Sequence, residues 1–74
     1  MAAMTRDEWI AAFAAELGVD APDAETIEVL LEAAGVAAHA SERPAAPITC
    51  YLIGLAHAGA DHGLATARSI APAD

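Results

Sequence analysis

The stretch Arg43-Pro44-Ala45-Ala46-Pro47, residues 43–47, divides the sequence into two helical halves. Proline lacks a backbone N–H and its ring clashes with the preceding turn, so two prolines three residues apart cannot lie inside a helix. Pro47 suits the first position of a following helix, where its missing N–H needs no partner. The pattern therefore predicts that one helix ends before this stretch and that another begins at Pro47.

The helix that begins at Pro47 is expected to run to about Ala58 and to end at Gly59. Its segment is apolar nearly all round, which is typical of a central helix or of one that a partner covers. The residues expected to face inward are Ile48, Tyr51, Leu52 and Leu55. A shorter helix is expected from Asp61. Its apolar face holds Leu64, Ala67 and Ile70.

The first helix of the N-terminal half is marked by Thr5 and Glu8, which have the spacing of a capping box. Gly18 fits its C-terminal end, because glycine readily adopts the left-handed conformation found there. The apolar face predicted for this helix holds Trp9, Phe13 and Leu17, with Ile10 beside them and Met4 as a hydrophobic staple to Trp9.

A second helix is predicted from Asp23, a good N-cap after Pro22, to about Ser41. Its inward stripe is expected to hold Ile27, Leu30, Leu31, Ala34 and Ala38. Gly35 lies within this pattern, and we expect it to allow a neighbouring helix to approach closely. The sequence has no strand pattern, so the prediction is one all-α domain, residues 1–74, built as a compact bundle of three helices plus a short fourth helix.

The composition limits both the core and the function. Hydrophobic residues make up 57% of the chain, but 22 of them are alanine, so bulky core side chains are few. Small domains of this kind are usually stabilised by disulfides, metals or association, and a single cysteine leaves association as the expected route. The net charge of −8 with three arginines argues against binding to nucleic acid or to an anionic membrane surface. A lone cysteine and the lack of a signal-like N-terminus indicate a cytoplasmic protein.

Catalytic and cofactor chemistry finds little support in the sequence. The group His57, Asp61 and His62 is interrupted by Gly59 and is weak as a zinc site, and Cys50 in an apolar helix is expected to be a small buried hydrophobe. Acyl carrier proteins are also short acidic helical chains, but they carry phosphopantetheine on the serine of an Asp-Ser-Leu motif at the start of their second helix. The corresponding stretch here is Asp23-Ala24-Glu25, which has no serine. We therefore expect no enzyme activity, no metal and no resident cofactor.

The most distinctive segment begins at His39. His39 and Arg43 are four residues apart, so we expect them to share a face at the end of the second helix, where cations complement the helix dipole. The guanidinium group of Arg43, held beside a rigid proline loop, could also donate two parallel hydrogen bonds to a carboxylate or phosphate. The residues predicted to bind a partner are His39, Arg43, Pro44, Pro47, Thr49 and Tyr51.

The sequence resembles a small domain family of unknown function that is common in actinobacteria. The runs that carry the resemblance are Ala37–Ala40, Arg43–Thr49 and Tyr51–Gly54, together with Glu8-Trp9, Phe13 and Glu16–Gly18. Members stand alone or follow a molybdenum cofactor guanylyltransferase, and are often encoded near formate dehydrogenase and its sulfurtransferase-like accessory protein. The last helix is shorter here than is usual in that family, and Cys50 replaces a small hydroxyl residue.

The resemblance implies an accessory role beside a molybdenum enzyme or its cofactor biosynthesis, through a protein partner. Two alternatives remain open: a structural protein that self-associates through the third helix into a homo-oligomer, and a direct binder of molybdopterin-guanine dinucleotide through Arg43 and His39.

Overall fold

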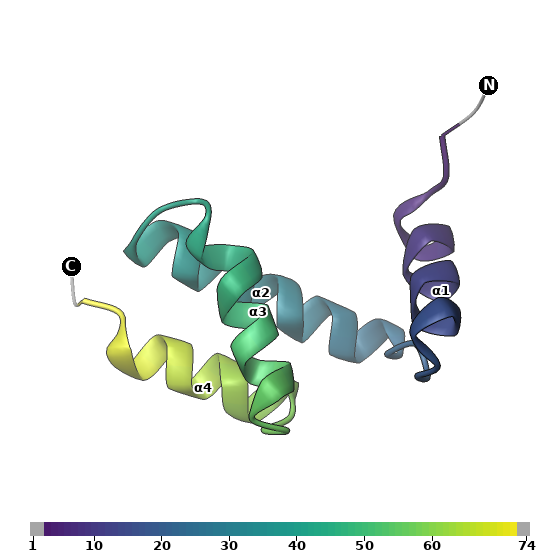
Figure 1. Cartoon of the computed structure of the whole chain (residues 1–74). Coiled ribbons are helices and arrows are strands. Elements are labelled where there is room, and N and C mark those ends of the chain that lie inside the picture. Colours follow the sequence, from purple (N-terminus) through teal and green to yellow (C-terminus); the bar gives the residue numbers. More distant parts are fainter. Residues whose placement is uncertain (1–2, 73–74) are drawn as a thin grey trace.

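A computed structural model describes residues 3–72 and contains four α-helices (Figure 1). Their bounds are Arg6–Leu17 for α1, Ala24–Ala40 for α2, Ala45–Leu55 for α3 and Ala60–Ile70 for α4. No residue of the described range lies in a β-strand. The predicted all-α fold with four helices is confirmed.

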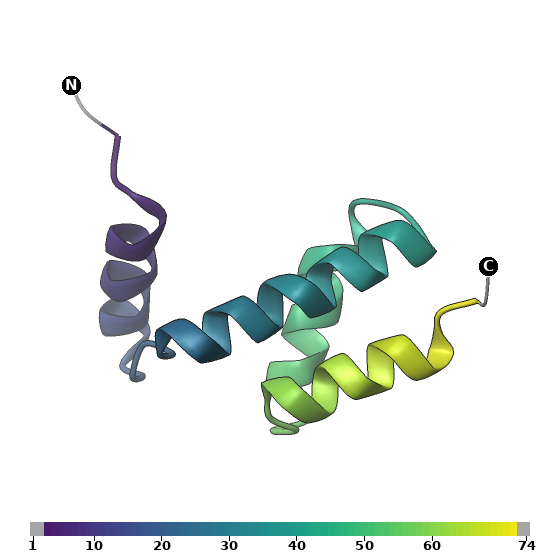
Figure 2. The same cartoon turned by 180° about the vertical axis from the view of Figure 1, so that it is seen from behind.

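Helix α2 is the element on which the fold is built. Both α3 and α4 pack against it: α3 crosses α2, and α4 then turns back alongside α2 (Figures 1 and 2). These three helices form the compact part of the molecule. Helix α1 lies beyond the start of α2, away from α3 and α4, and the molecule is therefore elongated, with extents of 43 × 29 × 19 Å.

The ends of α1 follow the sequence signals. The Thr5 hydroxyl accepts a hydrogen bond from the Glu8 N–H at 3.1 Å, and the Glu8 carboxylate accepts one from the Thr5 N–H at 2.8 Å, which completes the predicted capping box. At the other end Gly18 adopts φ 77°. The N–H of Val19 then reaches the carbonyl of Ala14 at 3.0 Å, which satisfies a terminal carbonyl of the helix.

Asp23 is the N-cap of α2, and its carboxylate accepts a hydrogen bond from the Thr26 N–H at 2.8 Å. The helix continues through Gly35 to Ala40, as predicted. The expectation of a close helix approach at Gly35 is wrong, because a Cβ added there would have no atom within 4 Å. The close approach occurs instead at Gly63 of α4, against the side chain of Ile53.

The core is built from small side chains. Ala33 of α2 is fully buried, at 0% exposure, and the other buried apolar side chains are Ala14, Leu64 and Ala67. Four of the five residues predicted for the inward stripe of α2 are half-buried, but Leu31 is about half exposed, and the fully buried residue of the helix is Ala33. An alanine at this position lets two helices pack closely on a third. On α4, Leu64 and Ala67 are buried as predicted, whereas Ile70 is 80% exposed.

Helix α3 begins two residues earlier than predicted, at Ala45, so that Pro47 lies within its first turn. This position is permitted because the first four N–H groups of a helix have no intrahelical partner. The helix also ends earlier, at Leu55, and His57 adopts the left-handed conformation with φ 54°. Gly59, expected to end α3, is instead the N-cap of α4.

The predicted orientation of α3 is wrong. Ile48, Tyr51, Leu52 and Leu55 are all more than half exposed. The opposite face packs inward: the Cys50 thiol donates to the Leu30 carbonyl at 3.8 Å, and Ile53 lies over Gly63. Because α3 is apolar on every side, periodicity could not decide which face is buried. The small residue at position 63 favours the observed face, since it leaves room for the side chain of Ile53.

Candidate functional site

An apolar groove lies between α2, α3 and α4 and is open to solvent on one side. Its volume is about 680 Å³, within the range of roughly 300–1,000 Å³ that is common for ligand sites. Small and branched apolar side chains form its walls, together with threonines. Representative lining residues are Val36, Ala37, Thr49, Leu52, Thr66 and Ile70.

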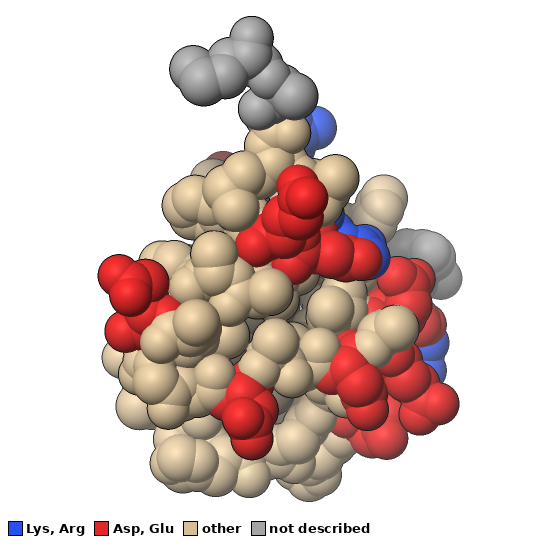
Figure 3. Space-filling view, turned by 90° about the vertical axis from the view of Figure 1, so that its right-hand side faces the viewer, with Lys and Arg blue, Asp and Glu red and all other residues tan. Residues whose placement is uncertain are grey.

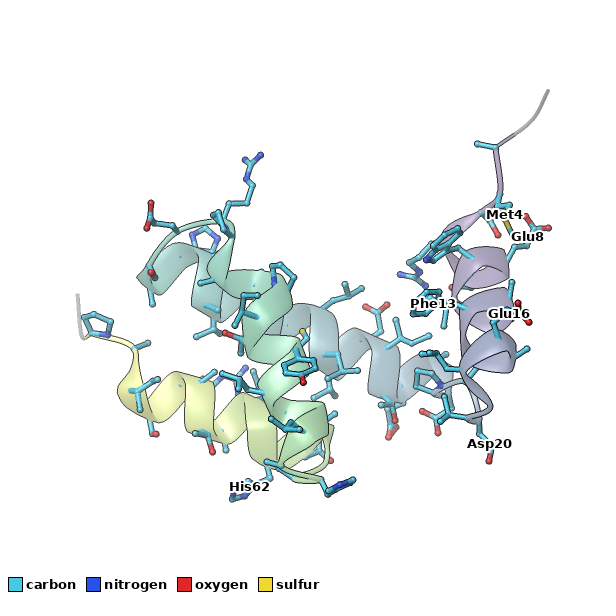
Figure 4. The ribbon with its side chains drawn as sticks, viewed as in Figure 1. Met4, Glu8, Phe13, Glu16, Asp20 and His62 are labelled. Atoms are coloured by element: carbon cyan, nitrogen blue, oxygen red, sulfur yellow. The ribbon has the colours of Figure 1, made fainter. Side chains whose placement is uncertain are left out.

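A few polar groups lie among the apolar walls of the groove. Ser41 lies at the C-terminal end of α2, Thr49 is half-buried on α3, and Thr66 is exposed on α4. His62 lines the groove from the first turn of α4, close to the turn that joins α3 and α4 (Figure 4). Hydroxyl and imidazole groups in such places can hydrogen-bond to the backbone or side chains of a bound segment.

The structure places the predicted partner-binding residues around the turn between α2 and α3. His39 is exposed in the last turn of α2, Arg43 is exposed in the turn itself, and Pro44 is the N-cap of α3. Pro47 is exposed in the first turn of α3, and of this set Thr49 lines the groove. Tyr51, at 65% exposure, lies on a different face of α3.

Arg43 does not lie on the helix that carries His39. Helix α2 ends at Ala40, and Ser41 has φ −135° and ψ −106°, far from helical values. Arg43 therefore lies outside the helix, and the four-residue spacing no longer sets its position relative to His39. Helical spacing alone therefore does not support a paired anion site at these two residues.

The carboxylates of α2 connect that helix to its neighbours. Arg6 of α1 lies 3.7 Å from Glu28, and Arg68 of α4 pairs with Glu32. Arg6 also pairs with Asp7 at 2.9 Å, and among the ion pairs of residues 3–72 Arg43 takes part in none. All these pairs are solvent-exposed, so each contributes about 0–1 kcal/mol.

Charge is distributed unevenly along the chain. Acidic side chains occupy separate places on the end of the molecule that α1 forms (Figure 3). By contrast, the sequence between Arg43 and Asp61, which includes all of α3, contains no Asp, Glu, Lys or Arg. An uncharged apolar helix on a protein of net charge −8 is where another polypeptide can bind with the least electrostatic cost.

Cys50 lacks the surroundings of a nucleophile. The thiol is half-buried against α2, and burial raises its pKa above the ordinary value. A reactive cysteine needs the opposite shift, because the thiolate is the attacking form. Within residues 3–72, no three His, Cys, Asp or Glu side chains form a group that could hold a metal ion.

Sequence reasoning missed two apolar surfaces. One is the groove, whose walls from α2 and α4 include Val36, Ala37, Thr66 and Ala67. The other consists of exposed stripes of large side chains: the stripe on α1 is the predicted apolar face, and the stripe on α3 was expected to face inward. The run of uncharged residues after Arg43 was the available signal, because an interior helix and a helix that binds a partner have the same composition.

Within the described part of the chain, no helix is both long enough and apolar enough to cross a membrane. A family model described as "Domain of unknown function (DUF6457)" matches residues 1–73. Comparison with curated proteins and with solved structures gives no significant match.

Proposed function

The chain belongs to this family of domains of unknown function, and we propose that it is a non-catalytic interaction domain whose groove binds a helical segment of a protein partner. The observation that carries the proposal is the 680 Å³ groove itself, which is apolar, open and formed by three helices. Grooves between helices commonly bind the apolar face of an amphipathic helix. Thr49 and Thr66 would contact the polar edges of that helix.

Charge indicates the character of the partner. The chain has a net charge of −8, whereas the α3 wall of the groove is uncharged. Acidic residues such as Glu42 and Asp61 lie in sequence next to the segments that line it. A segment with apolar residues on one face and Lys or Arg on its flanks would fit this arrangement, and attraction over the whole molecule would speed its association.

The resemblance of the motif Arg43–Thr49 to domains that accompany molybdenum cofactor proteins supports a more specific partner. We place the partner among the subunits of a molybdenum enzyme related to formate dehydrogenase, or among the proteins that make or insert its cofactor. Arg43, which is exposed and outside the ion pairs of residues 3–72, would bind a carboxylate of this partner beside the groove. The lone half-buried Cys50 is consistent with a reducing, cytoplasmic setting.

Site-specific cross-linking in the native host tests this proposal. A photoreactive amino acid at Thr66, which lines the groove, is compared with one at Ala65, which is exposed on the same helix but does not line it. We expect position 66 to cross-link to a molybdenum enzyme subunit or a cofactor-maturation protein, and position 65 to do so much less. Products that contain only unrelated proteins, or equal products at both positions, would contradict the proposal.

The contribution of Arg43 is tested with the partner so identified. The variant Arg43→Ala should bind it more weakly, by about 5- to 150-fold, since a charge-assisted hydrogen bond contributes about 1–3 kcal/mol. The matched control is Arg6→Ala, which removes an arginine at the other end of the molecule. Unchanged affinity in Arg43→Ala would remove Arg43 from the site.

A further inference from the structure

Two stripes of large apolar side chains remain exposed outside the groove. The α1 stripe consists of Trp9, Phe13 and Leu17, and the α3 stripe consists of Ile48, Tyr51 and Leu55; all six side chains are more than half exposed. Each stripe lies along one face of its helix, because its members are three or four residues apart. Contiguous exposed apolar surface of this kind on a small soluble domain indicates a contact with another polypeptide.

The α1 stripe is an ordered surface. The rings of Trp9 and Phe13 stack, with centroids 5.8 Å apart and an interplanar angle of 16°. In Figure 4, Phe13 points from α1 toward the side on which α3 lies, whereas Glu8 and Glu16 point away from it. Ile10 and Ala14, on another side of α1, are the residues with lower exposure. The aromatic stripe therefore faces the open corner between α1 and the rest of the molecule.

We propose that two copies of this chain pair reciprocally, with the α1 stripe of each packing on the α3 stripe of the other. The stripes match in length: Trp9 to Leu17 spans about 12 Å and Ile48 to Leu55 about 10 Å, at the helical rise of about 1.5 Å per residue. Because α1 lies away from α3 of its own chain, each copy offers one free surface of each kind. A two-fold axis would satisfy all four surfaces at once.

Charge permits a second copy on this face. Two molecules of net charge −8 repel each other, and the cost of association is smallest where one side of the contact carries no acidic groups. Helix α3 meets this condition, since its sequence contains no charged residue. It can accept α1 of a second molecule, whose carboxylates Asp7, Glu8 and Glu16 would meet no like charge on α3.

The area available indicates a weak, reversible dimer. Covering about 100 Å² of each of the six side chains, in both copies, would bury roughly 1,200 Å². This area is at the lower end of the range for specific protein–protein interfaces. The dimer is therefore expected to dissociate on dilution and to become stronger in salt, which screens the repulsion between the two acidic molecules.

Sedimentation of the purified chain, with no other protein present, tests the pairing. From about 5 µM to about 1 mM, the wild-type mass should rise from that of the 7.5 kDa chain toward twice that value. Phe13→Lys alone and Tyr51→Glu alone should each remain monomeric. An equimolar mixture of the two should again dimerise, because one contact then pairs Lys with Glu and the other is wild type.

The mixture distinguishes the reciprocal arrangement from other dimers. Pairing of α1 with α1, or of α3 with α3, would leave one single variant dimeric; that result would overturn the proposal, and so would a monomeric mixture or a monomeric wild type. Circular dichroism confirms that each variant is folded, and Leu17→Lys with Ile48→Glu replaces the pair if one is not. The groove is not used here, so a negative result leaves the proposed function standing.

Discussion

The side chain of Ile53 occupies the space beside Gly63 that a larger residue would need. A Cβ built on Gly63 would lie 2.5 Å from Ile53 Cδ1, 2.6 Å from Cγ1 and 2.9 Å from Cγ2. These distances mean that the branched side chain of Ile53 on α3 packs directly against the backbone of α4 at Gly63. No residue with a Cβ would leave room for this contact. The contact also fixes which face of α3 is buried, and hence which residues line the groove.

Replacing Gly63 by alanine is therefore expected to destabilise the fold. Overpacking of a closely packed site costs about 1–3 kcal/mol, which exceeds the gain of about 1 kcal/mol in helix propensity. In a domain of this size each kcal/mol lowers Tm by about 4–8 °C. Thermal unfolding followed by circular dichroism measures the effect, and Ile53→Ala in the same chain should recover part of the loss.

Gly35→Ala is the matched control for that substitution. Gly35 also lies inside a helix, but a Cβ added there meets nothing within 4 Å. The free energy of unfolding should rise by about 0.5–1 kcal/mol, from helix propensity alone. If both variants changed Tm in the same direction and by the same amount, the contact between Ile53 and position 63 would not be the cause.

His57→Gly is expected to stabilise the protein. His57 has φ 54°, and its N–H bonds to the Gly54 carbonyl at 3.0 Å while the Ala58 N–H bonds to the Ile53 carbonyl at 3.3 Å. This is the Schellman arrangement, in which the left-handed residue is usually glycine. Relief of backbone strain should add about 1 kcal/mol to the free energy of unfolding. His57→Ala keeps a Cβ and should give no gain, and a lower Tm for His57→Gly would contradict this account.

The N-cap of α2 should give stability a specific dependence on pH. The hydrogen bond from the Thr26 backbone N–H holds the pKa of the Asp23 carboxyl below its ordinary value of 3.8. A lowered pKa in the folded state means that the ionised cap stabilises the fold above pH 3.8, and that this contribution is lost as pH falls through the folded pKa.

Thermal unfolding of Asp23→Ala against wild type between pH 7 and pH 2 measures the contribution of this cap. The difference in Tm should be constant at neutral pH and should shrink below pH 3.8. Asp23→Asn, which keeps an acceptor oxygen but does not titrate, should cap the helix at all pH values. A difference for Asp23→Ala that persists unchanged at pH 2 would show that ionisation of Asp23 plays no part.

Cys50 should react slowly with thiol reagents in the folded protein. Burial against α2 raises its pKa, so the thiolate fraction at neutral pH is lower than that of a free cysteine. The rate of reaction with an aromatic disulfide should increase on unfolding in denaturant. The control is Cys50→Ser combined with Ser69→Cys, which places the only thiol at an exposed position of α4 and should react rapidly in the folded state.

Local structure was predictable wherever it depends on residues close together in the sequence. The Thr5–Glu8 capping box, the Asp23 cap and the Gly18 stop were all predicted correctly, because each depends on residues within one turn. The end of α3 at His57 was missed because histidine adopts φ > 0 much less readily than glycine. The nearby Gly59 was therefore the expected end.

The orientation of helices was not predictable in the same way. Every face of α3 is apolar, so the neighbouring helices decide which face is buried. The residue that meets Ile53 of α3 is Gly63, which carries almost no hydrophobic signal. The rule that large side chains face inward therefore selected the wrong face of α3. The same reversal concealed the groove, whose walls depend on small residues such as Ala37 and Ala67.

The groove is tested most directly by calorimetric titration of the cross-linked partner into three purified forms of the chain. These forms are the wild type, Thr66→Trp and Ala65→Trp. The first substitution fills the groove, whereas the second adds the same side chain to an exposed position of α4 outside it. We expect Thr66→Trp to bind at least about tenfold more weakly, a loss of about 1.4 kcal/mol, while Ala65→Trp binds as the wild type does. Equal affinity for all three forms would show that the groove is not where the partner binds.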